Sequence, residues 1–336
     1  MRLKDIAAEL GVSVSTVSRA LNHPELNAAG PELTQRILSI ASRENYMPDP
    51  VALRLKSTRC GDQVDNLYIL IARPQAEVKD DPFYNTLITS ITREAGVYRR
   101  VIRCIYSVPD GGLEEMLPGF APEAPGDVIV LGRFSSSLLP ALRSAFNHIV
   151  CLSLNRLDVD CDQVICDGYE AVQDALSYLY RLGHRCFAFI GAEREQRHMG
   201  FLRGMEKLGY APGSYTVEQM EGLSMDSGYR GMEHLLQTMP AVTGVVCAND
   251  MIAIGALQAC KDQGYRVPDD LSLIGMVDIP NGRFVEPKLT TIHVPMEEMG
   301  RIAVRALQEQ MLGLRTLPLR LMVPYRIIER NSCKAL

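Results

Sequence analysis

Residues 3–22, LKDIAAELGVSVSTVSRALN, hold two short helical patterns separated by a glycine. In the first pattern, apolar residues recur at the spacing of one helix face: Leu3, Ile6, Ala7 and Leu10. Gly11 permits a sharp exit from that helix, and Ser13 can cap a second helix that begins at Val14. The stretch therefore predicts a helix-turn-helix, whose second helix has the shape that fits the major groove of DNA.

The outer face of the second helix carries short polar side chains and one arginine. Arginine can donate paired hydrogen bonds to guanine, valine can contact a thymine methyl group, and serine can pair with several base edges. We therefore expect base contacts from Val14, Ser15 and Arg19, and phosphate contacts from Thr16, Ser18 and Asn22. The alternative is a small helical hairpin with a solvated polar face, but the turn chemistry favours DNA binding.

Two further helices are expected after this motif. Residues 31–45 predict a third helix, which completes a small three-helix core. A shorter helix follows, which Asp49 can cap and Pro50 can begin, with Ala52 and Leu55 on one side. Because so short a helix is marginal in water, we expect it to order against another surface, such as a bent minor groove that accepts an apolar wedge.

This part of the chain resembles the headpiece and hinge of the LacI/GalR family of bacterial transcription repressors. The match rests on residues 3–22 and on the sequence NYMP at residues 45–48. The resemblance implies that Leu55 wedges into the minor groove at the operator's centre and that bases are read at Val14, Ser15 and Arg19. Family members often carry asparagine where this chain has Asp49.

Composition agrees with a large globular chain whose first part meets DNA. With 336 residues, of which 47% are hydrophobic, the chain can bury a large core and suggests two or three domains. The net charge is −5, which argues against nonspecific binding of polyanions by the whole surface. Residues 1–60 carry eight Lys/Arg against six Asp/Glu, so their net charge is +2 and that of the remainder is −7.

The cysteines do not predict a disulfide framework or a zinc site, because their number, nine, is odd and none forms a C-x-x-C pair. A metal site at Cys161 and Cys166, beside Asp160 and Asp162, is an alternative, but it lacks histidine or further cysteine partners. We therefore expect no metal and no cofactor. No apolar run reaches 18 residues, so the protein is expected to be cytoplasmic, with no membrane partner.

From about residue 65, apolar strands alternate with amphipathic helices, a pattern typical of doubly wound α/β layers. The strands are expected at residues 67–72, 101–106, 127–131, 148–152, 185–190, 241–247 and 272–276. Helices are expected between them at residues 84–96, 168–182, 198–208, 227–237 and 250–263. In open parallel sheets ligands bind beyond the carboxyl ends of strands, so the segments after these strands form the candidate site.

Polar and aromatic residues follow five of these strands: Asp81, Phe83 and Tyr84, then Ser153, Arg197, Asn249 with Asp250, and finally Val277 with Asp278. Each group has a structural alternative, namely helix caps at Asn249 and Asp250, a packing pair at Phe83 and Tyr84, and a surface ion pair at Arg197. Together they predict a cleft suited to polyhydroxyl ligands, because aromatic faces and paired polar groups recognise sugars.

The family resemblance extends over most of the chain through four further motifs: GHR at 183–185, Arg197 with Gly200 and Phe201, AND at 248–250, and PKLTT at 287–291. It implies an effector domain similar to periplasmic sugar-binding proteins, with effector contacts at Arg197 and Asn249. Two acidic effector positions of the family fall on Ser153 and Val277 in this chain. The segments 81–84 and 277–287 are most similar to repressors of β-galactoside utilisation, which favours a galactoside as the effector.

The expected fold is an all-α helix-turn-helix headpiece with a hinge helix, followed by an α/β, periplasmic-binding-protein-like domain of two doubly wound parallel-sheet subdomains. The headpiece is expected at residues 1–48, the hinge helix and linker at 49–60, and the effector-binding and dimerisation domain at 61–336. Within that domain, the N-subdomain combines about 65–155 with 293–323, and the C-subdomain combines about 156–290 with 324–332.

The expected function is sequence-specific transcriptional regulation, as a repressor of a carbohydrate-utilisation operon whose operator affinity a small-molecule effector controls. The resemblance also implies a homodimer, because residues 96–103 and the helix after Pro295 fall where family members dimerise. No leucine heptad extends the C-terminal part, which argues against a coiled-coil tetramer. Partners would be double-stranded operator DNA and a sugar.

Two alternatives remain open at this point, and two others are disfavoured by the sequence. A regulator of the same fold could respond to a non-sugar ligand such as a purine, or the chain could bind a ligand without any effector response. A sugar-transport component would share the cleft, but this chain begins with a DNA-reading helix pair. An enzyme would need catalytic groups, and the sequence contains no G-x-S-x-G, H-E-x-x-H or P-loop motif.

Overall fold

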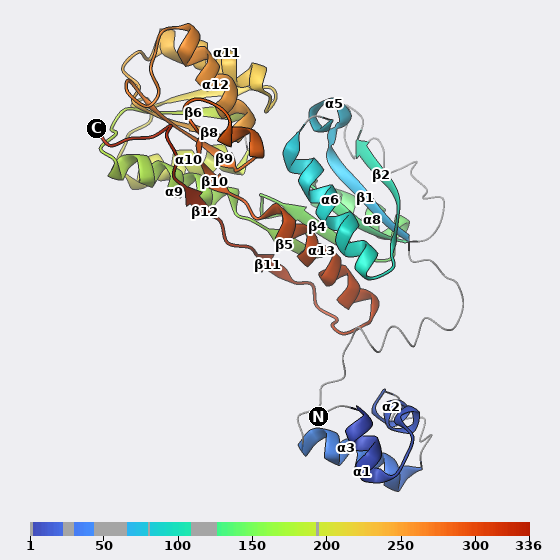
Figure 1. Cartoon of the computed structure of the whole chain (residues 1–336). Helices are drawn as coiled ribbons and strands as arrows, with labels where there is room; N and C mark the ends of the chain where they lie inside the picture. The colour runs from blue at the N-terminus through green and yellow to red at the C-terminus, as the bar shows by residue number, and fades with distance from the viewer. Residues whose placement is uncertain (1–2, 23–29, 44–65, 80, 109–125, 193–194) are drawn as a thin grey trace. The chain divides into compact units, whose positions relative to one another are not determined.

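The computed structural model describes residues 3–22, 30–43, 66–79, 81–108, 126–192 and 195–336 (Figure 1). The chain divides into two compact units, residues 1–63 and residues 64–336. The hinge segment expected at residues 49–60, with Ala52 and Leu55, lies outside the described residues.

The first unit contains the predicted helix-turn-helix. Its helices are α1 (Leu3–Leu10), α2 (Val14–Asn22) and α3 (Pro31–Arg43). Gly11 has a φ of 64°, the left-handed conformation expected of the turn, and Ser13 Oγ accepts a hydrogen bond from the backbone N–H of Thr16 at 3.1 Å. Ile6, Val17 and Ile37 are fully buried, one from each helix, so the three helices share one apolar core.

The second unit contains two six-stranded sheets. The first sheet has the order β11-β5-β4-β3-β1-β2, and the second has the order β12-β10-β9-β8-β6-β7. All neighbouring strands are parallel except β10 and β12, which pair antiparallel. Strands of the first sheet are β1 (Asn66–Pro74), β2 (Val101–Val108), β3 (Asp127–Leu131), β4 (Ile149–Ser153), β5 (Asp162–Ile165) and β11 (Arg320–Met322). Strands of the second are β6 (Phe187–Ala192), β7 (Thr216–Met220), β8 (Gly244–Cys247), β9 (Ser272–Val277), β10 (Thr290–His293) and β12 (Arg326–Ile328).

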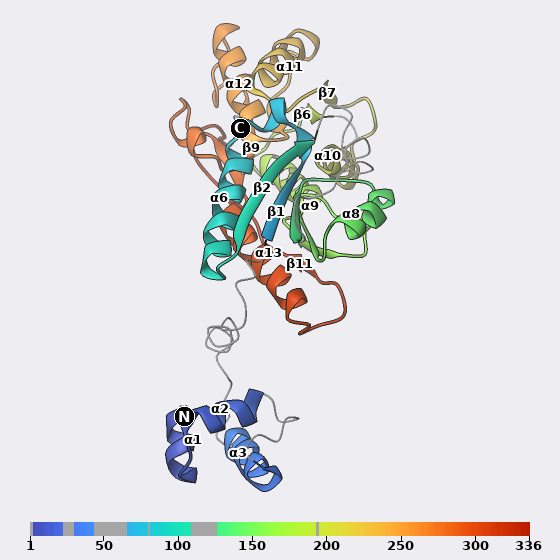
Figure 2. The same cartoon turned by 90° about the vertical axis from the view of Figure 1, so that its right-hand side faces the viewer.

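Helices cover both faces of the first sheet, as a doubly wound fold requires. Leu67, Ile69 and Ile71 of β1 belong to the core that also contains α6 (Pro82–Val97) and α13 (Met296–Met311). Tyr68 and Leu70 of the same strand pack into a second core with α8 (Leu139–Ala145). Figure 2 shows α6 and α8 on opposite sides of β1 and β2. The strand is therefore buried on both faces, which explains why its sequence is continuously apolar.

Two helix pairs accompany the second sheet (Figure 1). One pair is α9 (Gly168–Arg181) and α10 (Gln196–Lys207), and the other is α11 (Met225–Thr238) and α12 (Asp250–Asp262). A Cβ atom at Gly255 of α12 would lie 1.8 Å from the carbonyl oxygen of Met225, so only glycine allows α11 and α12 to approach this closely.

The chain passes between the two sheets three times. It leaves the first sheet after β5 for α9, returns after β10 through α13, and crosses again between β11 and β12. The seven predicted strands are all present, although residues 241–243 precede β8, where Val242 N–H donates to the Met239 carbonyl in a turn. Five short strands were not among the expected ones: β5, β7, β10, β11 and β12.

Candidate functional site

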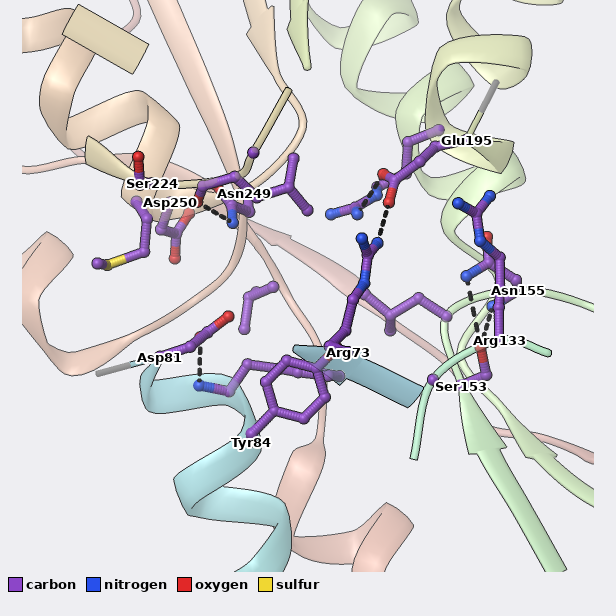
Figure 3. Close-up of a pocket in the computed structure, with 18 of the residues that line it drawn as sticks. Arg73, Asp81, Tyr84, Arg133, Ser153, Asn155, Glu195, Ser224, Asn249 and Asp250 are labelled. Carbon is purple, nitrogen blue, oxygen red and sulfur yellow. Dashed lines mark hydrogen bonds and ion pairs between the residues drawn. The ribbon is translucent and has the colours of Figure 1, made fainter. Parts of the chain in front are cut away.

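A cavity of about 380 Å³ lies at the carboxyl ends of strands from both sheets. From the first sheet and its helices it receives Arg73, Asp81, Phe83, Tyr84, Gly132, Arg133, Ser153, Leu154 and Asn155. From the second it receives Glu195, Arg197, Gly222, Leu223, Ser224, Asn249, Asp250, Met251, Val277 and Ile279 (Figure 3). The position agrees with the rule that ligands of open parallel sheets bind beyond the carboxyl ends of strands.

Seven of the eight predicted effector residues line this cavity: Asp81, Phe83, Tyr84, Ser153, Arg197, Asn249 and Val277. Asp278 does not, because its buried carboxylate pairs with Arg330 and lies 3.0 Å from His293 Nδ1. Val277 and Asp278 have φ values of 119° and 63°, so the chain turns sharply where β9 ends. We therefore leave Asp278 out of the site and assign it a structural role.

An ion-pair chain crosses the cavity from one sheet to the other. Arg73, at the end of β1, donates to Glu195 Oε1 at 2.7 Å, and Arg197 of α10 donates to the other carboxylate oxygen of Glu195. Arg197 Nη1 also donates to the carbonyl oxygen of Ala248 at 2.6 Å. Figure 3 shows the Glu195 carboxylate above Arg73 and joined to it by a dashed line. These ion pairs link the two subdomains through Glu195, which is 1% exposed.

The charges around Glu195 control its protonation. Burial raises the pKa of Glu195, but the charges of Arg197, Arg73 and Arg133 and the hydrogen bond from Arg197 outweigh it, so the pKa falls below its ordinary value. Burial raises the pKa of Tyr84 to about 12. Glu195 is therefore ionised at neutral pH, and Tyr84 keeps its phenolic proton.

Helix caps form part of the cavity wall. Asn249 Oδ1 accepts from the Ile252 N–H at 2.8 Å, and its Nδ2 donates to the Leu223 carbonyl at 3.1 Å. Asp81 Oδ1 accepts from the Phe83 N–H at 2.9 Å. Asn249 therefore performs the capping role that the sequence left open, Asp81 also caps its helix, α6, and both side chains face the cavity.

Ser153 and Asn155 form a second polar group, after β4. Ser153 Oγ accepts from the Asn155 backbone N–H at 3.0 Å and from Asn155 Nδ2 at 3.4 Å. Figure 3 shows this pair beside Arg133, across the cavity from Asn249. The cavity therefore offers hydroxyl, amide, carboxylate and guanidinium groups to a polar ligand.

Sequence reasoning missed Arg73, Arg133, Asn155 and Glu195 as lining residues. Arg73 is within β1 near its carboxyl end, and Arg133 and Asn155 follow β3 and β4 by two residues. The strand-end rule could have found these three, since it applies to every strand of the sheet. Glu195 follows β6 by three residues, so the same rule could have found it as well, but its pairing with Arg73, 122 residues away, carries no sequence signal.

Asp250 is the most deeply buried charged residue of the cavity wall and is 0% exposed. Its Oδ1 accepts from Thr291 Oγ1 at 2.5 Å and its Oδ2 from the Ile279 N–H at 2.8 Å. Burial is the main reason that the pKa of Asp250 rises from 3.8 to about 6.

This shift predicts a pH dependence of stability. Because the folded-state pKa lies above the unfolded one, the stabilising effect of the bound proton is full below about pH 4 and is lost as the pH rises through about 6. Between pH 4.5 and 7.5, the unfolding free energy of the wild type should fall by about 2 kcal/mol relative to Asp250→Asn. Urea unfolding of both proteins at the two pH values measures this difference. A constant difference would show that Asp250 does not titrate in this range.

Models of two protein families match separate parts of the chain. Bacterial regulatory proteins of the lacI family match residues 2–49, and the periplasmic binding protein-like domain matches residues 176–333. The chain belongs to the LacI family of bacterial regulatory proteins. It is a DNA-binding transcriptional regulator with the two-part fold that its sequence predicted.

Relatives with similar sequences are named transcriptional regulators, which are not enzymes. The HTH-type transcriptional repressor MelR of Bacillus subtilis (strain 168) is 28% identical over 347 residues, covering 99% of this chain and 97% of that protein. The HTH-type transcriptional repressor PurR of Shigella sonnei (strain Ss046) is 29% identical over 344 residues, covering 98% and 96% of the two chains.

Solved structures of LacI-family regulators share the fold. The transcriptional regulator CelR in complex with cellobiose has a TM-score of 0.70 at 21% identity, covering 99% of both chains. The lac repressor dimer bound to operator and the anti-inducer ONPF has a TM-score of 0.69 at 20% identity, covering 100% of this chain and 99% of that one.

The LacI-type headpiece places the predicted DNA contacts on α2. Val14 is 41% exposed, and Ser15 is exposed too, with its Oγ 2.7 Å from Ser13 Oγ. Thr16 is half-buried, with Oγ1 2.8 Å from Ser13 Oγ. The backbone of Ser18, Arg19 and Asn22 continues the same helix.

Two further observations concern the described parts of the chain. Residues that the structure places contain no group of three or more His, Cys, Asp or Glu side chains arranged to hold a metal ion. Among the described helices, none is both long and apolar enough to cross a membrane.

Proposed function

We propose that the protein is a repressor of a carbohydrate-utilisation operon whose operator affinity is controlled by a sugar bound in the cavity. The observation that carries this proposal is the cavity at the strand ends, with its aromatic, amide and charged lining drawn from both subdomains. CelR in complex with cellobiose, a structure of the same fold, supports a sugar as the ligand. The effector class favoured by the sequence resemblance is a β-galactoside.

The DNA half of the proposal assigns operator reading to α2. Val14, Ser15 and Arg19 contact bases, while Thr16, Ser18 and Asn22 contact phosphates. Ala52 and Leu55 of the hinge contact the minor groove. The lac repressor structure contains a dimer on operator DNA, which supports a homodimer that reads two half-sites in the cytoplasm.

Effector control follows from the position of the cavity. A ligand that touches both subdomains binds one of their relative arrangements better than another and so shifts the population between them. Arg73, Glu195 and Arg197 form the contact across the cavity that such a ligand would change. A coupling of about 1–3 kcal/mol would change operator occupancy by roughly 5- to 150-fold.

Thermal unfolding in the presence of candidate ligands tests the effector half. The panel contains β-galactosides, other mono- and disaccharides, sugar phosphates and purines. A ligand at 100 times its Kd should add about 2.7 kcal/mol of stability. A sugar that stabilises the protein and changes the affinity for a selected operator supports the proposal. If only purines stabilise the protein, its effector is a purine and not a sugar. If a ligand stabilises the protein but does not change the operator affinity, the protein binds that ligand without being regulated by it.

Arg19→Ala tests the DNA half. The operator is first selected from random duplex DNA with the full chain. Loss of a paired arginine contact to guanine should weaken specific binding by about 1–3 kcal/mol and relax the preference at one base position in each half-site. Fluorescence anisotropy at fixed salt concentration measures both effects. Arg143→Ala, an exposed substitution in the second unit, serves as the control and should leave binding unchanged. If the Arg19 variant binds the operator as tightly as the wild type does, Arg19 is not one of the residues that contact bases.

A further inference from the structure

We propose that the effector carries an anionic group, a phosphate or a carboxylate, and that this group binds beside Arg73 and Arg133 at one end of the cavity. The inference rests on the proposed function, because it specifies the ligand of the same cavity. It goes beyond that proposal by dividing the cavity into two ends with different chemistry.

The charged side chains of the cavity are separated in space. Three arginines, Arg73, Arg133 and Arg197, gather around one carboxylate, that of Glu195. The other two lining carboxylates, Asp81 and Asp250, lie away from Glu195 and Arg133, on the side of Asn249 and Ser224 (Figure 3). Among the described lining residues, the whole cavity is formally neutral. At one end three arginines surround the single carboxylate of Glu195, and of these Arg73 and Arg197 also lie within electrostatic range of Asp81.

Glu195 shows what the arginine-rich end can hold. Its two oxygens accept from two different guanidinium groups, Arg73 at 2.7 Å and Arg197, and the surrounding charges keep it ionised. Guanidinium donors of this kind match the geometry of carboxylate and phosphate oxygens. Ser153 and Asn155 add a hydroxyl and an amide at the same end. An anionic group would therefore meet charged and neutral donors together.

The opposite end suits the neutral part of such a ligand. Asp81 and Asn249 present a carboxylate and an amide, and Ser224 presents an exposed hydroxyl. Groups of this kind accept hydrogen bonds from sugar hydroxyls, while an anion placed there would face the Asp81 carboxylate. The separation of charge fixes the orientation of the ligand, with its hydroxyl-bearing part toward Asp81 and its anionic group toward Arg133.

Matched ligands that differ in one group provide the test. Each ligand is titrated calorimetrically into the full chain. The panel contains D-galactose, D-galactose 6-phosphate and D-galacturonate, together with the glucose equivalents. An anionic member should bind at least about tenfold more tightly than its neutral parent, as expected of hydrogen bonds to a charged group. Tighter binding of either the phosphate or the uronate shows whether the anionic group of the effector is a phosphate or a carboxylate.

Two substitutions locate the anion. Arg133→Gln should weaken the anionic ligand by about tenfold and change the neutral parent by less than about twofold. Glu195→Gln, which keeps the side-chain shape and removes its negative charge, should tighten the anionic ligand. Arg143→Gln, at an exposed arginine outside the cavity, is the matched control and should have no effect.

The outcomes separate this inference from the proposed function. If neutral sugars bind as tightly as their anionic counterparts, or if Arg133→Gln weakens both equally, the anion site is wrong and the sugar-responsive repressor stands. If anionic sugars bind selectively but Arg133→Gln has no effect, the anion lies elsewhere and the inference fails. If no member of this panel binds while a neutral sugar of the thermal screen does, the inference is contradicted and the sugar-responsive repressor stands; if no sugar of either panel binds, both are contradicted.

Discussion

Arg100→Ala is expected to lower the free energy of unfolding by about 3–5 kcal/mol. The Arg100 side chain is 0% exposed and pairs with the buried carboxylate of Asp127. It also donates to the Asn66 carbonyl at 3.1 Å and to the Met311 sulfur at 2.9 Å, so it joins the amino ends of β1 and β3 to the end of α13. Removing Arg100 leaves the Asp127 charge buried with only His148 Nδ1, at 2.7 Å, as a side-chain partner among the described residues.

Urea unfolding of the full chain measures this loss. Arg143→Ala is the matched control, because Arg143 pairs with Asp160 at 3.3 Å on the surface and its loss should cost about 0–1 kcal/mol. Arg100→Met combined with Asp127→Leu should recover part of the stability, since it removes both charges together. A loss of less than about 1 kcal/mol in Arg100→Ala would show that water reaches Asp127 and that the pair is not buried in solution.

Arg197→Met is expected to weaken effector binding by roughly 30-fold or more, which corresponds to about 2 kcal/mol. Arg197 is 6% exposed, lines the cavity, and bonds both Glu195 and the Ala248 carbonyl. Methionine keeps much of the volume but removes the donors, so Glu195 would retain Arg73 and lose its partner within the second subdomain. The midpoint of effector-induced change in operator affinity should move to a correspondingly higher ligand concentration.

Calorimetric titration with the ligand found in the thermal screen measures the affinity. Arg203→Ala is the control on the same helix, because Arg203 is exposed and its ion pair is with Glu206, three residues away on that helix. The variant should unfold in one transition with the wild-type denaturant dependence if its fold is intact. An unchanged Kd in a folded variant would remove Arg197 from the binding site and would favour its structural role as the partner of Glu195.

Local patterns in the sequence were sufficient for the headpiece and for the long elements of the second unit. The spacing of Ile6 and Val17, the glycine at the turn and the cap at Ser13 all act within a few residues, so they can be seen without tertiary contacts. The same holds for β1 and β3, whose continuous apolar runs reflect burial on both faces.

Short strands had no such signal. β11 and β12 contain three residues each, with exposed positions, and they exist because they pair with β5 and β10. β5, with the sequence DQVI, has only four residues and follows Cys161 directly, in a stretch that the sequence analysis weighed only as a disfavoured metal site. The partners of β11 and β12 are far away in sequence, so no local window contains them, whereas β5 also pairs with β4, the strand directly before it.

The candidate site shows the same limit. Strand ends identified seven lining residues, because carboxyl ends of parallel strands share one edge. Glu195 acts through Arg73 across 122 residues, which spacing cannot reveal. Asp278 was expected beside the cavity, but its neighbours in space, Arg330 and His293, hold it in the core.

The crossing between β11 and β12 has a consequence for the growing chain on the ribosome. Each of the two sheets has at one edge a strand that is synthesised after all its other strands, residues 320–322 in one sheet and 326–328 in the other. The headpiece, in contrast, consists of residues that emerge before any strand of either sheet. A nascent chain can therefore present the three helices of the headpiece before either sheet is complete, and the two sheets that line the cavity are complete only after residues 320–328 have been made.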